Sequence, residues 1–446
     1  MRFASTRRQG DAVSLDEALV RGLAEDGGLY LPESLPRYDV GDFDGADSVT
    51  ETASVLLRPF FAESCLRGEL EAIVAETFTF PVPARELPVT PGRAWLLELF
   101  HGPTAAFKDV GARFLAACLS RLEQGAEVPL TVLVATSGDT GGAVAGAFAG
   151  REGVRVAVLF PDGRVSERQR RQLTGWGGNV LSLAVKGSFD DCQALVKQAM
   201  IDPLLRSRFR FTSANSINIG RLLPQCSYYA HAALAHHRRT GRKPGFIVPT
   251  GNLGNGLACI LARRMGLPVG EVVLATNANR IVPDYLDGAE WASRTSLATL
   301  ASAMDVGNPS NMERLMTLAG DRQSLQREIR ARAVSDADIE RQIAQDFREF
   351  GFATCPHTAT ATFTYGRLRE DERTDGDWII VATAHPAKFE RIVEPLIGEP
   401  VPVPDSLQAI LSRPERSVPI APELDAMVEA LDEACFLDEP VTTGDK

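Results

Sequence analysis

Apolar and β-branched residues form short continuous runs that alternate with longer helical patterns over most of the chain beyond Ala94. Runs of roughly four to eight such residues are typical of strands that are buried on both faces of a parallel sheet. Strands that alternate with helices predict an α/β fold with a parallel sheet. The predicted strands are residues 95–100, 130–135, 154–160, 246–248, 272–275 and 378–382.

The first 92 residues follow a different pattern and predict a separate N-terminal extension. Ser14 and Glu17 have the spacing of a capping box, which predicts the start of a short helix. Four prolines between residues 81 and 91 mark the connector to the α/β region, because proline interrupts both helices and strands.

Lys108 opens a helical pattern that extends to about residue 122. On this helix Lys108 shares one face with Ala112, Leu115 and Leu119, because residues four, seven and eleven positions apart line up. An ammonium group on an apolar face is costly, and loss of hydration lowers its pKa. A neutral lysine amine is what a Schiff base with a carbonyl cofactor needs. The alternative is a side chain that reaches water at the helix start.

Two glycine-rich turns each follow a predicted strand and precede a helical pattern. The first is Thr136-Ser-Gly-Asp-Thr-Gly-Gly142, and the second is Thr250-Gly-Asn-Leu-Gly-Asn-Gly256. A strand, a glycine-rich loop and a helix N-terminus together direct free backbone N–H groups and a positive dipole end at an anion. Two such turns predict two anion sites near Lys108.

Neither turn matches a standard nucleotide-binding motif. No lysine follows the glycines, as a Walker A loop requires, and Gly251, Gly254 and Gly256 lack the spacing of a dinucleotide fingerprint. Ser137 also lacks the flanking glycines of a nucleophile elbow. Pyridoxal 5′-phosphate fits better, because it has an aldehyde for Lys108 and a phosphate for one loop.

Motifs spread over the whole chain are similar to those of one family and occur in that family's order. They are residues 13–19, 26–32, 101–104, 107–109, 137–141, 187–193, 215–218, 249–255, 303–306 and 383–389. On these segments the chain resembles threonine synthase, of the longer branch found in many bacteria and in fungi. One departure is Leu253, which stands where the family often has phenylalanine. A phosphate cradle built from backbone groups should tolerate this change.

The resemblance implies the type II fold of pyridoxal-phosphate enzymes, with two open α/β domains and an N-terminal extension. Residues 1–92 would form the extension, residues 93–110 and 225–446 the large cofactor-binding domain, and residues 111–224 the small domain. The resemblance also implies a lyase of threonine biosynthesis that converts O-phospho-L-homoserine and water to L-threonine and phosphate. Phosphate would leave from the γ carbon, and water would add at the β carbon.

The resemblance further assigns roles to single residues. Lys108 would form the Schiff base and act as general acid and base. The residues implied for cofactor binding are Lys108, Asp139, Gly251, Asn252, Leu253, Gly254, Asn255 and Thr383. The residues implied for substrate binding are Ser137, Gly138 and Thr140 at its carboxylate and Ser216 and Arg221 at its phosphate.

Two of these assignments carry a chemical expectation. The carboxylate of Asp139 would be repelled by an ionised ring oxygen of the cofactor, so we expect it to turn toward backbone N–H groups at the helix entry. Thr383 follows the predicted strand 378–382, at the edge where open α/β sheets place their ligands. Its hydroxyl would face the pyridine nitrogen, although threonine also commonly caps a turn.

Composition narrows the functional classes. Of the 446 residues, 44% are hydrophobic and 24% are charged, as in globular proteins. No apolar run approaches roughly 18 residues, the length of a membrane span, and a net charge of −11 disfavours nucleic acid and membrane as partners. Seven cysteines without a Cys-x-x-Cys motif favour reduced thiols and a cytoplasmic location. The spacing of the histidines predicts no metal site.

Two other functions stay open on the sequence alone. A related pyridoxal-phosphate phospho-lyase would eliminate phosphate and release a keto acid and ammonia. A non-catalytic amino-acid sensor is a second alternative, although a sensor would not need Lys108. The sequence predicts no particular oligomeric state.

Overall fold

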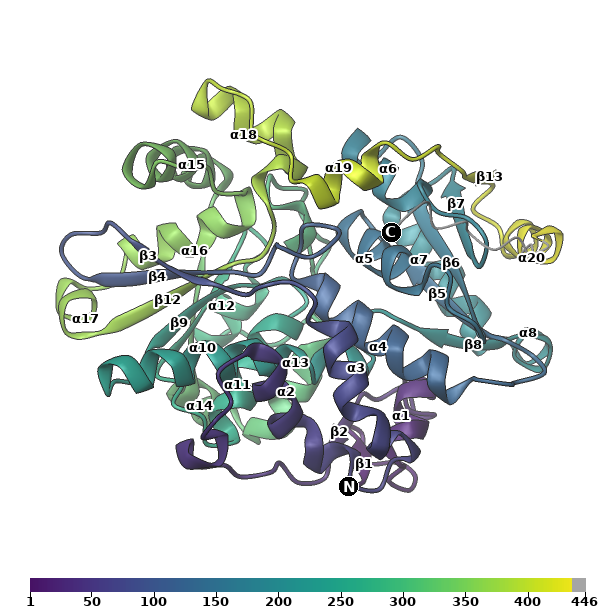
Figure 1. Ribbon diagram of the computed structural model, residues 1–446. Coiled ribbons are helices and arrows are strands. Elements are labelled where there is room, and N and C mark those ends of the chain that lie inside the picture. The colour runs from purple at the N-terminus through teal and green to yellow at the C-terminus, as the bar shows by residue number, and fades with distance from the viewer. Residues whose placement is uncertain (435–446) are drawn as a thin grey trace.

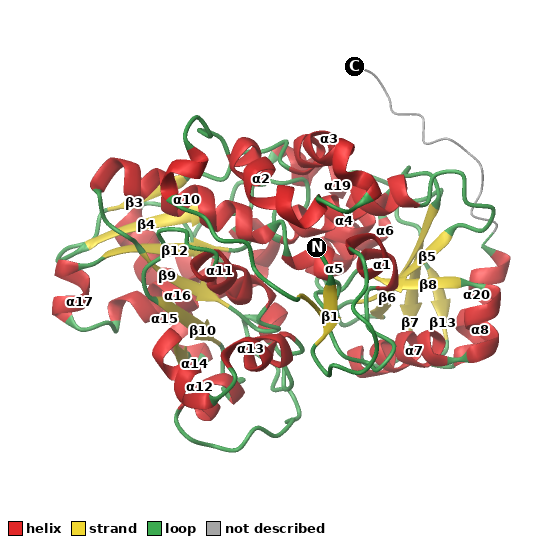
Figure 2. Ribbon diagram, turned by 90° about the horizontal axis from the view of Figure 1, so that it is seen from below, coloured by secondary structure: helices red, strands yellow, loops and turns green. Residues whose placement is uncertain are grey.

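The computed structural model describes residues 1–434, and Figures 1 and 2 show two groups of strands with helices packed around each. The strands are β1 (Phe3–Ser5), β2 (Tyr30–Pro32), β3 (Ala84–Leu87), β4 (Arg93–Glu98), β5 (Leu130–Ala135), β6 (Val154–Pro161), β7 (Val180–Val185), β8 (Arg210–Ser213), β9 (Gly245–Pro249), β10 (Val272–Thr276), β11 (Ile329–Ala333), β12 (Asp377–Ala382) and β13 (Val418–Ile420). Among these residues no helix is long and apolar enough to cross a membrane.

Helices connect most of the strands. The α-helices are α1 (Leu15–Arg21), α2 (Val49–Leu57), α3 (Leu70–Thr77), α4 (Lys108–Leu122), α5 (Asp139–Phe148), α6 (Glu167–Thr174), α7 (Phe189–Ile201), α8 (Pro203–Arg208), α9 (Ile219–Leu222), α10 (Gln225–Thr240), α11 (Gly254–Arg264), α12 (Ile281–Leu286), α13 (Asn311–Ala319), α14 (Arg322–Glu328), α15 (Asp336–Phe350), α16 (Pro356–Gly366), α17 (Glu370–Asp375), α18 (Glu390–Ile397), α19 (Asp405–Leu411) and α20 (Leu424–Glu433). The 3-10 helices are η1 (Val40–Phe43), η2 (Arg58–Phe61), η3 (Cys65–Glu69), η4 (Ser302–Met304) and η5 (Pro386–Phe389).

The two large sheets are open and almost entirely parallel. One has the strand order β11-β10-β9-β12-β4-β3, and the other has the order β13-β7-β6-β5-β8. In the first sheet β3 pairs antiparallel with β4, whereas the other neighbours are parallel. All the neighbours of the second sheet are parallel. The predicted α/β class is therefore confirmed.

Alternate residues of the central strands enter different hydrophobic clusters, because successive side chains point to opposite faces of a sheet. In β5, Val132 and Val134 pack in the cluster that contains α4 and α5. Leu133 and Ala135 pack in the cluster that contains α7 and α20. Both faces of this sheet are thus buried, which explains why β5 is a continuous apolar run.

The six predicted strands are all present, as β4, β5, β6, β9, β10 and β12, with small shifts at their ends. Five strands of the two large sheets are not predicted: β3, β8, β11 and β13 at the sheet edges, and β7 in the interior of the five-stranded sheet. Edge strands need only one bonded neighbour and carry more polar side chains. The sequence of β11, Ile329-Arg-Ala-Arg-Ala333, illustrates this difference.

The C-terminal segment departs from the predicted domain division. Strand β13 pairs with β7 of the five-stranded sheet, Val418 opposite Leu183, although residues 225–446 were assigned to the domain of the other sheet. A strand joins whichever sheet edge its chain can reach, and sequence position does not decide which. We propose that residues from β13 to α20 belong to the smaller domain, and that residues 1–92 form the N-terminal extension.

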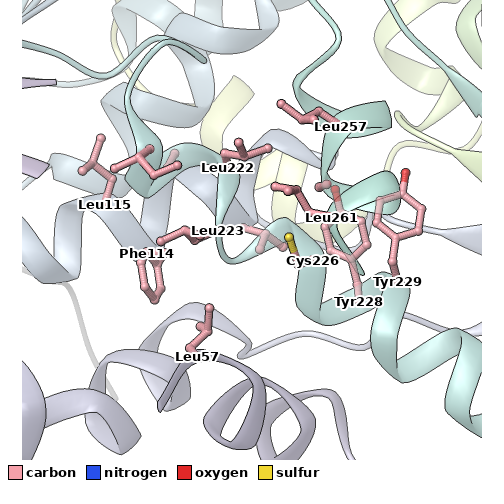
Figure 3. Close-up of a cluster of buried hydrophobic side chains, with 14 of the residues drawn as sticks. Leu57, Phe114, Leu115, Leu222, Leu223, Cys226, Tyr228, Tyr229, Leu257 and Leu261 are labelled. Atoms are coloured by element: carbon pink, nitrogen blue, oxygen red, sulfur yellow. The ribbon is translucent and has the colours of Figure 1, made fainter. Parts of the chain in front are cut away.

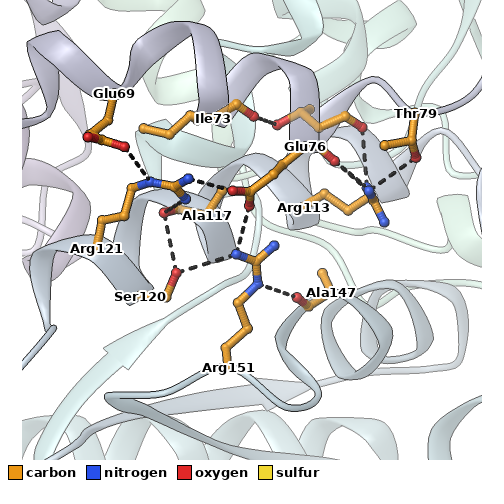
Figure 4. A network of polar contacts seen from close by, with 11 residues as sticks. Glu69, Ile73, Glu76, Thr79, Arg113, Ala117, Ser120, Arg121, Ala147 and Arg151 are labelled. Atoms are coloured by element: carbon orange, nitrogen blue, oxygen red, sulfur yellow. Dashed lines mark hydrogen bonds and ion pairs between the residues drawn. The ribbon is translucent and has the colours of Figure 1, made fainter. Parts of the chain in front are cut away.

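The N-terminal extension packs directly against α4, the helix that begins at Lys108 (Figure 4). Glu76 of α3 pairs with Arg121 of α4 and, at 2.9 Å, with Arg151 after α5. Arg113 of α4 donates to the backbone carbonyls of Glu76 and Thr77. The predicted capping box of Ser14 and Glu17 also starts α1 as expected.

Apolar side chains make a second connection between these elements (Figure 3). One cluster buries Leu57 of α2, Phe114 and Leu115 of α4, Leu222 of α9 and Leu261 of α11. The predicted apolar face of α4 is confirmed, since Ala112, Leu115 and Leu119 have no exposed surface. The helix that begins at Lys108 is therefore held on several sides.

Truncation of Leu115 tests how strongly this cluster stabilises the fold. Leu115→Ala should lower the free energy of unfolding by about 2–5 kcal/mol, because a buried leucine leaves a cavity. Leu204→Ala is the matched control, since that side chain is 79% exposed, and it should change stability by less than about 0.5 kcal/mol. Urea denaturation followed by circular dichroism measures both. Equal effects of the two substitutions would contradict the packing argument.

Candidate active site

A cavity of about 600 Å³ lies where several parallel strands of both sheets end. The loops that follow β5 and β9, the first residue of α4 and the residue after β12 all line it. The predicted site residues in its wall are Lys108, Ser137, Asp139, Thr140, Ser216, Arg221, Gly251, Asn252, Leu253, Gly254, Asn255 and Thr383. Of the predicted residues, Gly138 alone does not line this cavity. The carboxyl ends of open parallel sheets are the usual place for ligands.

Lys108 is the first residue of α4, and its side chain is only 14% exposed. Burial lowers the pKa of Lys108 to about 8, against the opposing attraction of Asp139. The Nζ atom of Lys108 is 3.9 Å from Oδ2 of Asp139, which is beyond a direct hydrogen bond. The expected loss of hydration is thus confirmed, and the amine faces the cavity.

The partners predicted for the Asp139 carboxylate are wrong. Among residues 1–434 its carboxylate binds no backbone N–H group but two side chains: Lys388 Nζ at 3.0 Å and Gln169 Nε2 at 3.3 Å, both at Oδ1. Burial alone would raise the pKa of Asp139, but Lys388 and Lys108 outweigh it and hold the pKa well below its usual range. The carboxylate is therefore ionised between two lysines.

The loop after β5 is held by a single hydroxyl group. Oγ1 of Thr136 accepts hydrogen bonds from the backbone N–H groups of Gly138 and Gly141, both at 2.9 Å. Gly138 has φ of +143°, and a Cβ atom there would lie 2.6 Å from the side chain of Gln169. Gly138 thus permits the turn, while Ser137 and Thr140 face the cavity.

The loop after β9 leads directly into α11 and leaves hydrogen-bond donors unused. Leu253 adopts the left-handed conformation, with φ of +64°, and α11 begins at the next residue. The first N–H groups of a helix have no partner within that helix. Oδ1 of Asn255 accepts from the hydroxyl groups of Tyr228 and Tyr229, whereas its buried Nδ2 has no partner among residues 1–434. An anion would satisfy these donors.

Ser216 and Arg221 approach the same cavity from the segment before α10. Nδ2 of Asn252 donates to Oγ of Ser216 at 2.5 Å, so this hydroxyl is tied to the loop after β9. Arg221 donates to the backbone carbonyls of Ala214 and Lys108, and its Nε has no partner within the described residues. Burial lowers the pKa of Arg221 to about 10, so the guanidinium is still charged at neutral pH.

Thr383 lies at the end of β12, as the sequence predicts, and is 5% exposed. Its backbone carbonyl accepts from the N–H group of Phe107 at 2.8 Å, which joins it to the start of α4. Its side chain forms part of the cavity wall.

Sequence reasoning missed three residues that shape the site. Lys388 and Gln169 bind Asp139, and His357 lines the cavity with a pKa that burial lowers to about 4. Lys388 lies inside the motif 383–389, between Ala387 and Phe389. A lysine in such apolar surroundings is the signal that could have identified it.

Three family models match this chain. The model described as pyridoxal-phosphate dependent enzyme matches residues 76–384, the model described as threonine synthase N terminus matches residues 2–78, and the model described as threonine synthase, C-terminal, matches residues 358–431. Threonine synthase of Serratia marcescens is 39% identical over 91% of this chain and 93% of its own length. The chain belongs to the threonine synthase family.

Solved structures agree with this membership. The crystal structure of threonine synthase from Escherichia coli covers 97% of this chain and 100% of its own, with 36% identity and a TM-score of 0.86. PLP-bound threonine synthase from Brucella melitensis covers 97% of this chain and 99% of its own, with 32% identity and a TM-score of 0.89. The type II fold is thus confirmed, and pyridoxal 5′-phosphate is the cofactor of this threonine synthase family member.

The residues of the site fit this cofactor. The unpaired Nδ2 of Asn255 and the N-terminus of α11 suit a phosphate group. The amine of Lys108, with its lowered pKa, suits an aldehyde.

Replacement of Asn255 by aspartate tests the phosphate cradle. Asn255→Asp keeps an oxygen that accepts from Tyr228 and Tyr229, but it replaces the Nδ2 donor with a negative charge. Loss of one charge-assisted hydrogen bond costs about 1.5–3 kcal/mol, so Kd for pyridoxal phosphate should rise at least roughly ten- to a hundredfold. Fluorescence titration measures it. Tyr229→Phe, which leaves Nδ2 in place, is the control and should bind with nearly normal affinity. Unchanged binding by Asn255→Asp would refute the cradle.

Proposed function

We propose that this chain converts O-phospho-L-homoserine and water to L-threonine and phosphate. The observation that carries the proposal is the largely buried amine of Lys108, which faces a cavity that two glycine-rich loops also line. Membership of the threonine synthase family supports the same reaction. When bound, pyridoxal phosphate would supply an electron sink that stabilises negative charge on carbon atoms of the substrate.

Lys108 would hold the cofactor through Nζ and would also move protons. A side chain that both donates and accepts protons works best when its pKa lies near the operating pH. Burial brings the pKa of Lys108 to about 8, so part of the amine is unprotonated at neutral pH. We infer that the amino group of the substrate would first replace Lys108 on the cofactor, and that the freed Nζ would then take a proton from the α carbon of the substrate and transfer protons at the β carbon.

Three parts of the site would orient the cofactor. Residues 251–255 would bind its phosphate, where Nδ2 of Asn255 and the N-terminus of α11 supply donors. The hydroxyl of Thr383 would meet its pyridine nitrogen from the end of β12. Asp139 would lie near its ring oxygen, with its charge balanced by the lysines on either side.

The substrate would be bound at both of its anionic ends. Ser137 and Thr140 would supply hydrogen-bond donors to its carboxylate at the N-terminus of α5, whereas Gly138, whose N–H group is bonded to Thr136, would only shape the turn. Ser216 and Arg221 would bind its phosphate, for which a guanidinium is well shaped. Because the whole chain has a net charge of −11, these local donors must provide the attraction.

We also propose a cytoplasmic location. The six cysteines within residues 1–434 are free thiols, and five of them are buried. Free thiols are typical of a reducing compartment.

The reaction products separate this function from its alternatives. Purified full-length protein with O-phospho-L-homoserine should form phosphate and threonine in equal amounts, and Lys108→Ala, with unchanged circular dichroism, should form neither. Phosphate with a keto acid and ammonia would instead indicate the phospho-lyase reaction. Amino-acid binding without any product would indicate the sensor. The assignment fails on either outcome.

The proposed phosphate contacts are tested by Arg221→Ala. Loss of a charge-assisted contact costs about 1.5–3 kcal/mol, so KM for O-phospho-L-homoserine should rise roughly ten- to a hundredfold. Kd for pyridoxal phosphate should change much less. Ser216→Ala removes a neutral partner and should have a smaller effect, of about 0.5–1.5 kcal/mol. Steady-state kinetics measures both, and an unchanged KM and kcat/KM for Arg221→Ala would exclude the role.

A further inference from the structure

Lys388 is a fully buried cation beside the active-site cavity. It belongs to η5, has no exposed surface, and donates from Nζ to the backbone carbonyl of Thr104 at 2.7 Å. The same Nζ lies 3.0 Å from Oδ1 of Asp139. A buried ammonium is costly unless it is paired and hydrogen-bonded, and these two acceptors meet that condition.

The position of Lys388 is fixed by its surroundings. Thr104 is itself held by Asp109, which accepts from its N–H group at 2.9 Å and from its hydroxyl at 2.6 Å. Arg168 of α6 donates to the backbone carbonyl of Ala387, the neighbour of Lys388. Asp139 begins α5 of the smaller sheet, so its pair with Lys388 joins the two units of the fold.

Asp139 lies between two lysines but is bound unequally by them. Its Oδ1 forms a direct contact of 3.0 Å with Lys388, whereas its Oδ2 is 3.9 Å from Nζ of Lys108. A separation of 3.9 Å is too long for a hydrogen bond. Asp139 thus forms its direct ion pair with Lys388 and not with Lys108.

We propose that Lys388 is a positioning residue whose ammonium group binds the Asp139 carboxylate and keeps it from pairing directly with Lys108. Without Lys388, a lone buried carboxylate would hold the proton on the nitrogen of Lys108. With Lys388 in place, its ammonium group balances the charge of Asp139, so the carboxylate holds the proton on Lys108 less strongly. This inference rests on the proposed role of Lys108 and adds a residue for which no role was assigned.

The other groups that act on Lys108 keep constant charges near neutral pH. Arg221 is still protonated, since its pKa is about 10, and burial lowers the pKa of His357 to about 4, so its ring is neutral. Besides burial, which has the largest effect on the pKa of Lys108, the neighbouring charges that act most on its proton are those of Asp139 and Lys388.

A double-mutant titration tests the proposal on the full-length enzyme loaded with pyridoxal phosphate. The pH at which the absorbance of the Lys108-bound cofactor changes is measured for Lys388→Met, for Asp139→Asn and for both together. Lys388→Met should raise this pH by about one unit or more, a tenfold change in proton affinity. Asp139→Asn should lower it, and the double variant should stay near the wild-type value because the two removed charges balance.

Two controls separate charge from structure. Lys388→Arg keeps the cation and should titrate like the wild type. Arg168→Met removes the contact with the Ala387 carbonyl but leaves the Asp139 pair, so its titration should also be unchanged.

The proposal is overturned if Lys388→Met titrates like the wild type, or if the double variant titrates like Asp139→Asn. Should Lys388→Met fail to fold, the comparison of the double variant with Asp139→Asn decides, because the double variant leaves no unpaired buried charge. Since the titration uses no substrate, it is independent of the threonine assay. If the wild-type enzyme forms no threonine, the proposed function is refuted. The expected order of the titration midpoints among the variants would still hold.

Discussion

The burial of the Lys108 amine is the constraint on which the rest of this structure depends. An amine removed from water loses its proton more readily, and the pKa of Lys108 falls to about 8. The amine stays buried only if the first turn of α4 keeps a fixed position. The apolar contacts of Leu115 and the polar contacts of Arg113 hold the helix against the N-terminal extension. The extension is therefore part of the support of the active site.

The same support reaches the residues that face the substrate. Arg314 is fully buried and donates to the carbonyls of Tyr30, Ser216 and Ile217. It thus connects β2 of the extension to the segment that contributes Ser216 to the cavity. Asn311, one turn earlier on α13, donates to the carbonyl of Asn252 in the loop after β9. One helix consequently fixes both segments at once, so their spacing does not depend on either loop alone.

Buried cations lie at the active-site cavity although the whole chain is acidic. The net charge is −11, yet Lys108 and Lys388 lie on either side of the buried carboxylate of Asp139, and the buried guanidinium of Arg221 lines the same cavity. Helix N-termini and unpaired amide groups add further positive potential without a titratable group. An anionic substrate and an anionic cofactor are thus attracted locally, although the surface as a whole is acidic.

Local patterns in the sequence determined most of the central strands, helix α4, the capping box at Ser14 and both glycine-rich turns. These features depend on neighbouring residues, whose spacing is visible along the chain. Only the tertiary structure decided that β13 joins the smaller sheet and that Lys388 binds Asp139. Partners far apart along the chain are selected by which groups are buried together, since a buried charge must be matched by whatever lies beside it. The spacing of residues along the chain therefore does not predict which distant groups become partners.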